Sequence, residues 1–371
     1  MKKTTCIITI IGTISITLNF FFLFLYIYPI IKEKYIQYKL NRIDNSENIV
    51  DLINTYNKDL LQAKESLDYY YPTNNPKENI NKFFSNSPSA YQYGEYGWLI
   101  YLQLSNAIEK NDTSTISLIK GIFDKEIIST KIERADQAIY GCTSIMLYNH
   151  FKDLKYKYFA DNIYKFLETT TQDDIILYRP IEDTQRVDVL GFVCPFLSLY
   201  KTIAPNIKLN SQQQIENYIK YGVDYKTGMP CKGYTITNKI KVKHINWTRG
   251  WAWFGLALSF NKEPLQPNDS ILINRFYNNV SQILKKEKKM PSFYPDINDC
   301  DMSSTLPLLF FCNKWERNTF SVQEIQSIIQ KHCYQGQILP NLPSYSTGEN
   351  GKYYQNHFLT QGMAIALLNQ Y

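Results

Sequence analysis

Hydrophobic residues recur every three to four positions along most of the chain, which is the spacing of an amphipathic or buried helix. Strand-like alternation is confined to short pieces such as residues 234–242. Some helical segments begin with side chains that cap helices well: Asn45-Ser46, Asp112-Thr113, Asn210-Ser211 and Asn268-Asp269. The pattern predicts helices near residues 46–70, 89–109, 113–124, 133–150, 153–170, 185–202, 210–221, 247–260, 269–287, 300–317, 321–333 and 356–370.

The predicted helices are spread evenly, at about 27 residues for each helix with its loop, and no long linker interrupts them. An α-solenoid also consists of helix pairs, but the sequence contains no repeat of fixed period. A single all-α domain over residues 45–371, an (α/α)6 toroid of six helical hairpins, fits the pattern better.

The N-terminal part of the chain differs from the rest. Residues 6–31 are 26 consecutive positions without a charge, long enough to span a hydrocarbon core of about 30 Å as a helix. A cleaved signal peptide has a shorter apolar region that ends in small residues, whereas this stretch ends in Tyr-Pro-Ile-Ile-Lys. We therefore expect a membrane anchor over residues 1–32, a juxtamembrane segment over 33–44, and then the barrel.

The orientation of the anchor is not fixed by its flanking charges. Lys2 and Lys3 precede the apolar stretch, and the basic residues Lys32, Lys34, Lys39 and Arg42 follow it. We expect a single-pass membrane protein whose barrel is extracytoplasmic.

The cysteines do not suggest a metal site or a disulfide framework. Neither a Cys-x-x-Cys pair nor a Cys/His ligand spacing occurs in the sequence, so a structural zinc is not expected. We expect no other metal and no cofactor. Buried free thiols are the preferred interpretation, which a reducing compartment would also suit. This interpretation covers Cys142, Cys194, Cys231, Cys300, Cys312 and Cys333.

Composition and charge exclude several classes of protein. The 371 residues are 44% hydrophobic and 20% charged with a net charge of +6, so the chain can bury a core and is not a disordered polyelectrolyte. No dense Lys/Arg run indicates nucleic-acid binding. The 30 Tyr, 20 Phe and 5 Trp residues suit a protein that stacks on sugar rings, although a biased genome composition explains them equally well.

One segment is especially dense in aromatic and cationic groups. Trp247, Arg249, Trp251 and Trp253 lie where a predicted helix begins. Aromatic faces stack on sugars, and an Arg fork binds a carboxylate through two hydrogen bonds. The competing interpretation is that the Trp side chains pack in the core and that Arg249 pairs with an internal Asp.

Three aspartates also precede apolar helices: Asp136, Asp188 and Asp301. A carboxylate at a helix N-terminus usually serves as a cap. In a toroid, however, the inner helices begin at one mouth, so the three carboxylates would converge there. Carboxylates in such a mouth can act as general acid and base.

The order of these motifs resembles the unsaturated uronyl hydrolases, glycoside hydrolase families 88 and 105, over residues 133–371. The motifs are Asp136…Gly141, Asp188…Pro195-Phe196-Leu197, Asp224…Gly228-Met229, Trp247-Thr248-Arg249-Gly250…Trp253, Asp301-Met302-Ser303-Ser304 and Gln361-Gly362-Met363-Ala364. This resemblance implies an (α/α)6 barrel, independently of the helical pattern. The Trp-x-Arg-Gly-x-x-Trp motif is the most specific of the set.

The resemblance also implies a particular chemistry and site. Such enzymes hydrate the C4=C5 double bond of a 4,5-unsaturated uronic acid at a chain end, after which the neighbouring sugar is released. Asp188 matches the acid/base position, and Asp136 matches an acidic position that holds the substrate. Trp247, Arg249 and Trp253 match contacts to the uronate, and we group Asp301 with the substrate-binding residues.

Two positions depart from the pattern of these families. Lys232 stands where an assisting His is expected, and Trp251 replaces the amide residue that usually follows Arg-Gly. An ammonium can bind the substrate carboxylate, but it cannot both donate and accept a hydrogen bond as a neutral imidazole does. We therefore include Lys232 among the substrate-binding residues.

Three hypotheses for the function follow. The first is a membrane-anchored hydrolase of acidic oligo- or polysaccharides that uses Asp188. The second is a non-hydrolytic glycan-binding or accessory component of surface-polysaccharide assembly, which the anchor and Lys232 favour. The third is another (α/α)6 activity on uronate-containing chains. The sequence names no protein partner, and it contains no nucleotide-binding glycine loop, HExxH motif or nucleophile elbow.

Overall fold

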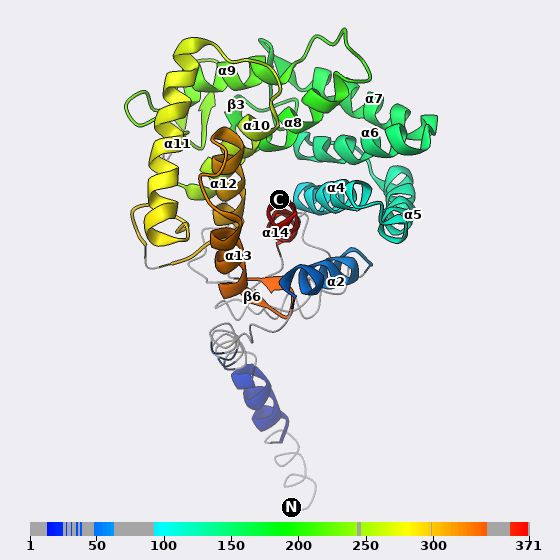
Figure 1. The fold of residues 1–371 in the computed structure, drawn as a ribbon, viewed down its shortest axis with the longest axis vertical. Helices are drawn as coiled ribbons and strands as arrows, with labels where there is room; N and C mark the ends of the chain where they lie inside the picture. Colours follow the sequence, from blue (N-terminus) through cyan, green and yellow to red (C-terminus); the bar gives the residue numbers. More distant parts are fainter. Residues whose placement is uncertain are drawn as a thin grey trace, which may run out of the picture.

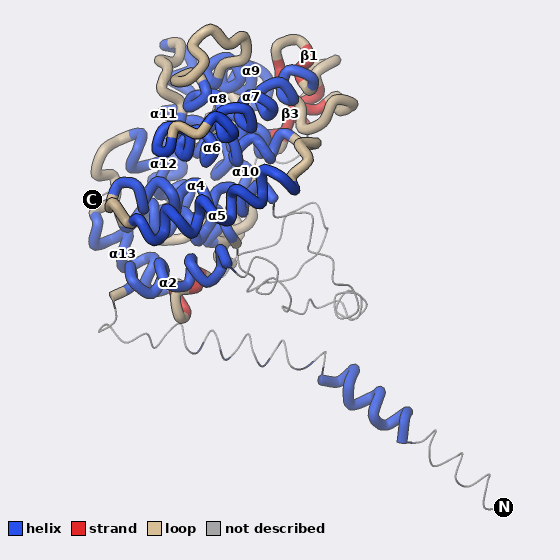
Figure 2. The backbone as a smooth tube through the Cα atoms, turned by 90° about the vertical axis from the view of Figure 1, so that its right-hand side faces the viewer, coloured by secondary structure: helices blue, strands red, loops and turns tan. Residues whose placement is uncertain are grey.

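The computed structural model describes residues 13–24, 27, 31, 35, 38, 48–62, 93–242, 246–297, 299–339 and 357–369. These residues are mostly helical, as the sequence predicts. The strands are short and lie in the connections between helices, where Figure 2 shows them at the periphery of the helical body.

Six helices form the inner wall of the fold. Each inner helix packs against the next in chain order, and the last packs against the first, so that the ring is closed (Figure 1). Most residues of these helices are buried, and the exposed ones lie at the C-terminal ends, because both faces of each helix are covered by other helices. They are α4 (Tyr93–Glu109), α6 (Ile139–Phe151), α8 (Val187–Tyr200), α10 (Thr248–Phe260), α12 (Met302–Trp315) and α14 (Phe358–Leu368).

Six further helices surround this ring and pack on its outer side. Most of them bury one apolar stripe and expose a polar face, as a helix between core and solvent must. They are α2 (Ile49–Gln62), α5 (Thr113–Ser129), α7 (Leu154–Thr169), α9 (Ser211–Gly222), α11 (Pro267–Glu287) and α13 (Val322–Lys331). Alternation of outer and inner helices around a closed ring is the predicted (α/α)6 arrangement.

The ring closes between segments that are far apart in the sequence. The outer helix α2 packs against both α4 and α14. The side-chain amide of Asn57 donates a hydrogen bond to the backbone carbonyl of Gln361 at 3.2 Å and one to Oε1 of Gln103 at 3.3 Å. These buried bonds join α2 to the last and first inner helices.

Short antiparallel strands lie in the connections between the helices. Strands β1 (Thr171–Gln172) and β2 (Ile175–Ile176) form one pair, and β6 (Cys333–Tyr334) and β7 (Gln337–Ile338) form another. A three-stranded sheet has the order β3 (Thr184–Arg186), β4 (Gly233–Thr235), β5 (Lys241–Val242). Arg186 pairs with Gly233 in this sheet, so the start of α8 lies beside the chain that precedes α10.

Helix starts follow the capping chemistry of the sequence with one exception. Asp112 and Asn210 accept hydrogen bonds from backbone N–H groups of α5 and α9, as predicted. Asn268-Asp269 does not begin a helix, because α11 already starts at Pro267. Proline suits the first helical position, since its fixed φ is helical and its missing N–H would have no partner there. Asn45-Ser46 lies outside the described residues.

The first turn of the segment predicted at 133–150 is not α-helical. Residues Ala135–Ala138 form the 3₁₀ helix η2, which leads directly into α6. The other predicted helices are present among the described residues, and their described ends differ from the predicted ones by a few residues. Parts of the segments predicted at 46–70 and 89–109, namely residues 46–47, 63–70 and 89–92, lie outside the described residues. The six cysteines Cys142, Cys194, Cys231, Cys300, Cys312 and Cys333 are free thiols.

The predicted membrane anchor lies only partly within the described residues. Of residues 6–31, the structure describes 13–24, 27 and 31, and all of these are helical. No helix among the described residues is long and apolar enough to cross a membrane. The predicted segments 1–32 and 33–44 otherwise fall outside the described part of the chain.

Candidate functional site

The N-terminal ends of the inner helices gather at one mouth of the barrel. Glu95 in the first turn of α4 interacts electrostatically with Asp136 in η2, with Asp188 in α8 and with Arg249 in α10. Asp136 and Asp188 also interact with each other. The structure therefore brings Asp136, Asp188 and Arg249 together, and it adds Glu95 to them.

Asp188 is the second residue of α8, two positions after Arg186, which occupies the N-cap position. Burial raises the pKa of its carboxyl above the ordinary value, while Arg186, Lys232 and nearby backbone N–H groups oppose that shift in part. The backbone N–H of Val187 donates to the carbonyl oxygen of Lys232 at 3.0 Å, which holds Lys232 beside the start of the helix. Asp188 is thus a protonatable carboxyl with a cationic neighbour.

Asp136 is buried at the mouth and held by two donors. The Arg134 guanidinium lies 3.2 Å from its Oδ2 atom, and the Tyr178 hydroxyl donates to the same oxygen at 3.1 Å. Its Oδ1 atom is buried and accepts no hydrogen bond from any described residue. Burial raises the pKa of Asp136, which Arg134 and Tyr178 partly oppose.

Glu95 is a site residue that the sequence analysis missed. Burial raises its pKa from 4.5 to about 7, and the nearby Asp136 and Asp188 carboxylates add to this shift. A Cβ atom at the preceding Gly94 would lie 3.0 Å from the carbonyl oxygen of Asp136 and closer still to the ring of Phe192. The glycine thus lets α4 approach η2 and α8 closely. In the sequence, Glu95 lies in the aromatic segment Tyr93-Gly94-Glu95-Tyr96, which carries no motif that indicates a site.

Trp247 occupies the N-cap position of α10, with 8% of its surface exposed. Its ring folds back over Gly250, where an added Cβ would lie 2.7 Å from the indole. This close approach explains why glycine follows Arg in the Trp-x-Arg-Gly motif. The Lys232 ammonium lies 5.7 Å from the centre of the Trp247 ring, so the two predicted binding residues are adjacent.

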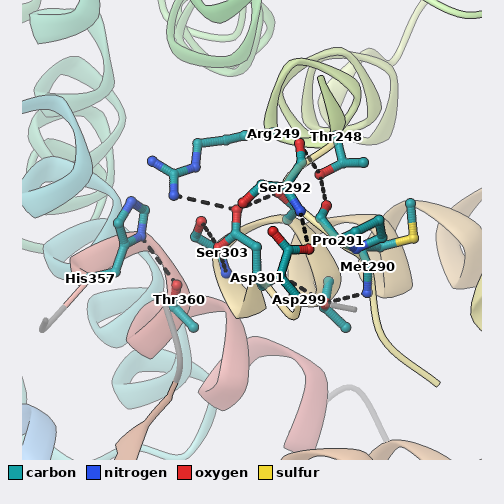
Figure 3. Close-up of polar contacts among 12 residues, drawn as sticks. Thr248, Arg249, Met290, Pro291, Ser292, Asp299, Asp301, Ser303, His357 and Thr360 are labelled. Carbon is teal, nitrogen blue, oxygen red and sulfur yellow. Dashed lines mark hydrogen bonds and ion pairs between the residues drawn. The ribbon is translucent and has the colours of Figure 1, made fainter. Parts of the chain in front are cut away.

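Arg249 extends from α10 toward Asp301 and His357 (Figure 3). Its guanidinium lies 3.4 Å from Oδ2 of Asp301. Asp301 caps α12 and also accepts hydrogen bonds from the backbone and hydroxyl of Ser303 and from the hydroxyl of Ser304. With 1% of its surface exposed, Asp301 is placed to hold Arg249, whereas a direct contact between Asp301 and substrate stays a prediction.

His357 is a second residue that the sequence analysis did not assign to the site. It caps the N-terminus of α14, and its Nδ1 atom lies 3.1 Å from the hydroxyl of Thr360 (Figure 3). Burial lowers its pKa well below the ordinary value, and the charge of Arg249 lowers it further. The ring is therefore a neutral imidazole on the side of the guanidinium end of Arg249 (Figure 3).

Trp253 lies deeper than the other predicted binding residues. Only 2% of its surface is exposed, and its ring packs 4.5 Å from that of Phe192, centre to centre. A Cβ at Gly191 would lie 2.6 Å from the indole, so α8 and α10 meet closely at this point. The placement gives Trp253 a packing role, and a direct substrate contact stays a prediction.

The mouth is rich in acids but does not form a ligand shell for a metal. Within the described ranges, no group of three or more His, Cys, Asp or Glu side chains is placed to hold a metal ion. The chemistry that the site offers is proton transfer by carboxyls and binding of anions by Arg249 and Lys232.

No protein-family model and no curated protein matches the chain, but solved structures do. A possible member of glycoside hydrolase family 105 from Klebsiella pneumoniae superposes with a TM-score of 0.68 at 12% identity, covering 88% of this chain and 94% of that one. The unsaturated glucuronyl hydrolase of Bacillus sp. GL1 gives 0.61 at 10% identity, covering 86% and 95%. The chain has the six-hairpin glycosidase fold.

The same fold also carries a different reaction. An α-1,6-mannanase from Salegentibacter superposes with a TM-score of 0.57 at 11% identity, covering 86% of this chain and 99% of that one. The fold alone therefore leaves the activity open, and the residues at the mouth must decide it.

Proposed function

We propose that the chain is a glycoside hydrolase that acts on uronate-containing glycans, with Asp188 as general acid and base. The observation that carries this proposal is the convergence of Glu95, Asp136 and Asp188 beside Arg249 at the mouth of the barrel. Likeness in fold to an unsaturated glucuronyl hydrolase supports the same class of substrate.

The raised pKa of the Asp188 carboxyl supports its role as an acid. A carboxyl with an ordinary pKa has lost its proton near neutral pH, whereas burial favours the protonated form of Asp188. Lys232 and Arg186 limit the shift, so the carboxylate that remains after proton donation is also stabilised. Both forms that an acid/base residue must adopt are thus accessible.

Cationic and aromatic groups beside Asp188 suit an acidic sugar. Lys232 and Trp247 lie together, and the Arg249 guanidinium, which points toward Asp301 and His357 in Figure 3, interacts with Glu95 at the mouth. A uronate carboxylate would bind to one of these cations while its ring packs against the small part of Trp247, 8% of its surface, that is exposed. The unpartnered Oδ1 atom of Asp136 would accept a hydrogen bond from a sugar hydroxyl.

In the proposed reaction, Asp188 donates its proton to C4 of a 4,5-unsaturated uronyl residue while water adds to C5. The water loses its proton to the Asp188 carboxylate, which restores the acid. The resulting C5 hemiketal opens by cleavage of its ring C–O bond. The hemiacetal then left at C1 releases the neighbouring sugar as an alcohol and becomes an aldehyde.

The membrane anchor is part of this proposal. Residues 6–31 have no charged side chain, and residues 13–24 within them are helical. We place the barrel on the extracytoplasmic side, where it would meet surface glycans. Alkaline extraction of membranes tests this: the full chain should stay in the pellet, and a variant that lacks residues 1–44 should be released. Release of both would refute the anchor.

The absorbance of unsaturated uronyl disaccharides in the near ultraviolet tests the reaction, because hydration removes the conjugated double bond. We expect the full-length chain to remove this absorbance and Asp188→Asn to abolish the activity. Asp59→Asn is the matched control, since Asp59 is exposed on the outer helix α2. Turnover by Asp188→Asn at the rate of the parent would show that Asp188 is only a helix cap.

A second candidate is a barrel that binds glycans without cleaving them. Lys232 at the position of the expected His favours it, because an ammonium cannot relay a proton as an imidazole does. In that case the absorbance would persist, while Trp247→Ala would weaken binding of an acidic polysaccharide about tenfold or more. Trp315→Ala on the far end of α12 is the control. Unchanged affinity in Trp247→Ala would place Trp247 in the core only.

A further inference from the structure

Three arginines surround one tyrosine ring at the mouth of the barrel. The guanidinium carbons of Arg134, Arg179 and Arg186 lie 5.8, 5.5 and 5.0 Å from the centre of the Tyr178 ring. Arg134 precedes η2, Arg179 lies in the connection between β2 and β3, and Arg186 ends β3. We call these three side chains the arginine cluster.

The segments that carry the acidic residues also position this cluster. The backbone N–H of Ala135 donates to the carbonyl oxygen of Tyr178 at 3.0 Å, and the Tyr178 hydroxyl donates to Asp136 at 3.1 Å. Arg186 is paired in the β3–β4 ladder two residues before Asp188. The backbone segments that carry the arginine cluster are therefore fixed relative to both carboxyls.

The charges of the arginine cluster are only partly balanced within the fold. Arg134 pairs with Asp136 at 3.2 Å, and Arg186 pairs with Glu182 at 3.1 Å. Arg179 is exposed and forms no ion pair with a described carboxylate. Three guanidinium groups around one ring repel one another, and a bound anion would relieve this repulsion while accepting their forked hydrogen bonds.

Asp136 provides a second indication of a ligand at this place. The side chain is 6% exposed, yet its Oδ1 atom accepts no hydrogen bond from the described residues. A buried acceptor without a donor is costly, and a sugar hydroxyl would satisfy it. An anion on the arginine cluster and a hydroxyl on Asp136 fit neighbouring groups of one acidic sugar.

We propose that the arginine cluster binds a second anionic group, a carboxylate or a sulfate ester, on the sugar adjacent to the uronyl residue at Asp188. This inference rests on the proposed function in that it assumes an acidic glycan in the mouth. Arg249 and Lys232 reach the mouth from α10 and from the chain before β4, so they serve the uronyl residue separately. The preferred ligands then carry negative charge on consecutive sugars.

Calorimetry with the full-length chain and three saturated disaccharides tests the proposal. The first probe carries one carboxylate, the second adds a sulfate on the neighbouring sugar, and the third carries a second carboxylate there instead. The measured quantity is the affinity of the second and third probes relative to the first. We expect a preference for at least one doubly anionic probe, which Arg179→Gln lowers about tenfold.

The matched control is Arg275→Gln on α11. Arg275 is also exposed and lies over a tyrosine ring, 5.7 Å from the centre of Tyr225, but on an outer helix. We expect this variant to keep the preference of the parent. Whether the sulfated or the dicarboxylate probe loses more affinity in Arg179→Gln identifies the anion.

Two results would overturn the arginine subsite. One is a parent chain that binds all three probes equally, and the other is a preference that survives Arg179→Gln. Saturated sugars lack the C4=C5 bond, so these affinities do not depend on hydrolysis. A chain that fails to hydrate unsaturated disaccharides but shows the Arg179-dependent preference would refute the hydrolase and support the subsite. A chain that hydrates them but shows no such preference would support the hydrolase and refute the subsite.

Discussion

The guanidinium of Arg249 lies 3.4 Å from the carboxylate of Asp301, and the two side chains are 7% and 2% exposed. The pair joins α10 to α12 at the mouth, where Figure 3 shows Ser303 beside it. Because Asp301 accepts four hydrogen bonds from within the chain, it keeps the guanidinium in place without needing a ligand. A substrate carboxylate would bind to a cation that the fold has already oriented.

Removal of Asp301 should therefore destabilise the fold strongly. Asp301→Ala leaves a buried guanidinium without its carboxylate, which costs about 3–5 kcal/mol, and it also removes the cap of α12. Asp112→Ala is the control, because Asp112 caps the outer helix α5 near the surface and should cost about 1 kcal/mol. Urea unfolding measures both. If Asp301→Ala and Asp112→Ala lowered the free energy of unfolding equally, the charge of Arg249 would be balanced without Asp301.

Lys232 should control the pH dependence of turnover. Its charge lowers the pKa of Asp188, against the larger effect of burial, so Lys232→Met should raise that pKa further. If protonated Asp188 is the acid, the rate falls as pH rises through this pKa, and the falling limb should move to higher pH in the variant. Lys239→Met is the control, since that ammonium lies over Tyr221 instead. If the falling limb of the pH–rate profile stays at the same pH in Lys232→Met, Lys232 does not influence the pKa of the catalytic acid.

Glu95 should make stability depend on pH. Its pKa is about 7 in the fold and 4.5 ordinarily, so its contribution to stability is fully present below pH 4.5 and is lost as pH rises to 7. The loss is up to about 3 kcal/mol. Glu95→Gln should match the parent at pH 4 and exceed it in free energy of unfolding at pH 8. Glu109→Gln, at the exposed end of the same helix, should show no such difference. If Glu95→Gln raised the free energy of unfolding equally at pH 4 and pH 8, the raised pKa of Glu95 would be contradicted.

Two glycines should respond oppositely to alanine. A Cβ at Gly141 in α6 would lie 2.3 Å from the Phe196 ring, so Gly141→Ala should destabilise by about 1–3 kcal/mol through overpacking. A Cβ at Gly121 in α5 would meet no atom within 4 Å. Gly121→Ala should stabilise by about 0.5–1 kcal/mol, because alanine favours the helix. Thermal unfolding measures the melting temperature of each variant. Equal changes in melting temperature for the two variants would contradict the prediction.

The helical spacing of hydrophobic residues was sufficient to predict the fold. Buried inner helices and amphipathic outer helices both place apolar residues at short intervals, so the spacing predicts helices. The even spread of the helices and the lack of a fixed-period repeat then favour a closed ring of hairpins over an α-solenoid. The start of α11 was mispredicted because Asn268-Asp269 is a good cap by residue type, whereas Pro267 is a better first residue.

Site residues were predictable from the sequence only where a charged residue stands at the start of an apolar helix. Asp136, Asp188 and Arg249 precede apolar helices and so point to the mouth, but Glu95 lies in an aromatic segment that reads as core. Pairing of Arg249 with an internal Asp was among the interpretations of the sequence, yet its partner Asp301 is 52 positions away. The arginine cluster depends on how two loops meet at Tyr178, which no spacing along the chain encodes.

The bond between Asn57 and Gln361 has a consequence for biosynthesis, since 304 positions separate its two partners. At about 5–20 residues per second, a ribosome needs about 15–60 seconds to travel from one to the other. During that interval α2 has no α14 to cover its apolar face, and the open ring exposes the sides of the inner helices that α14 will later bury. The nascent chain therefore needs protection from aggregation for most of its own synthesis.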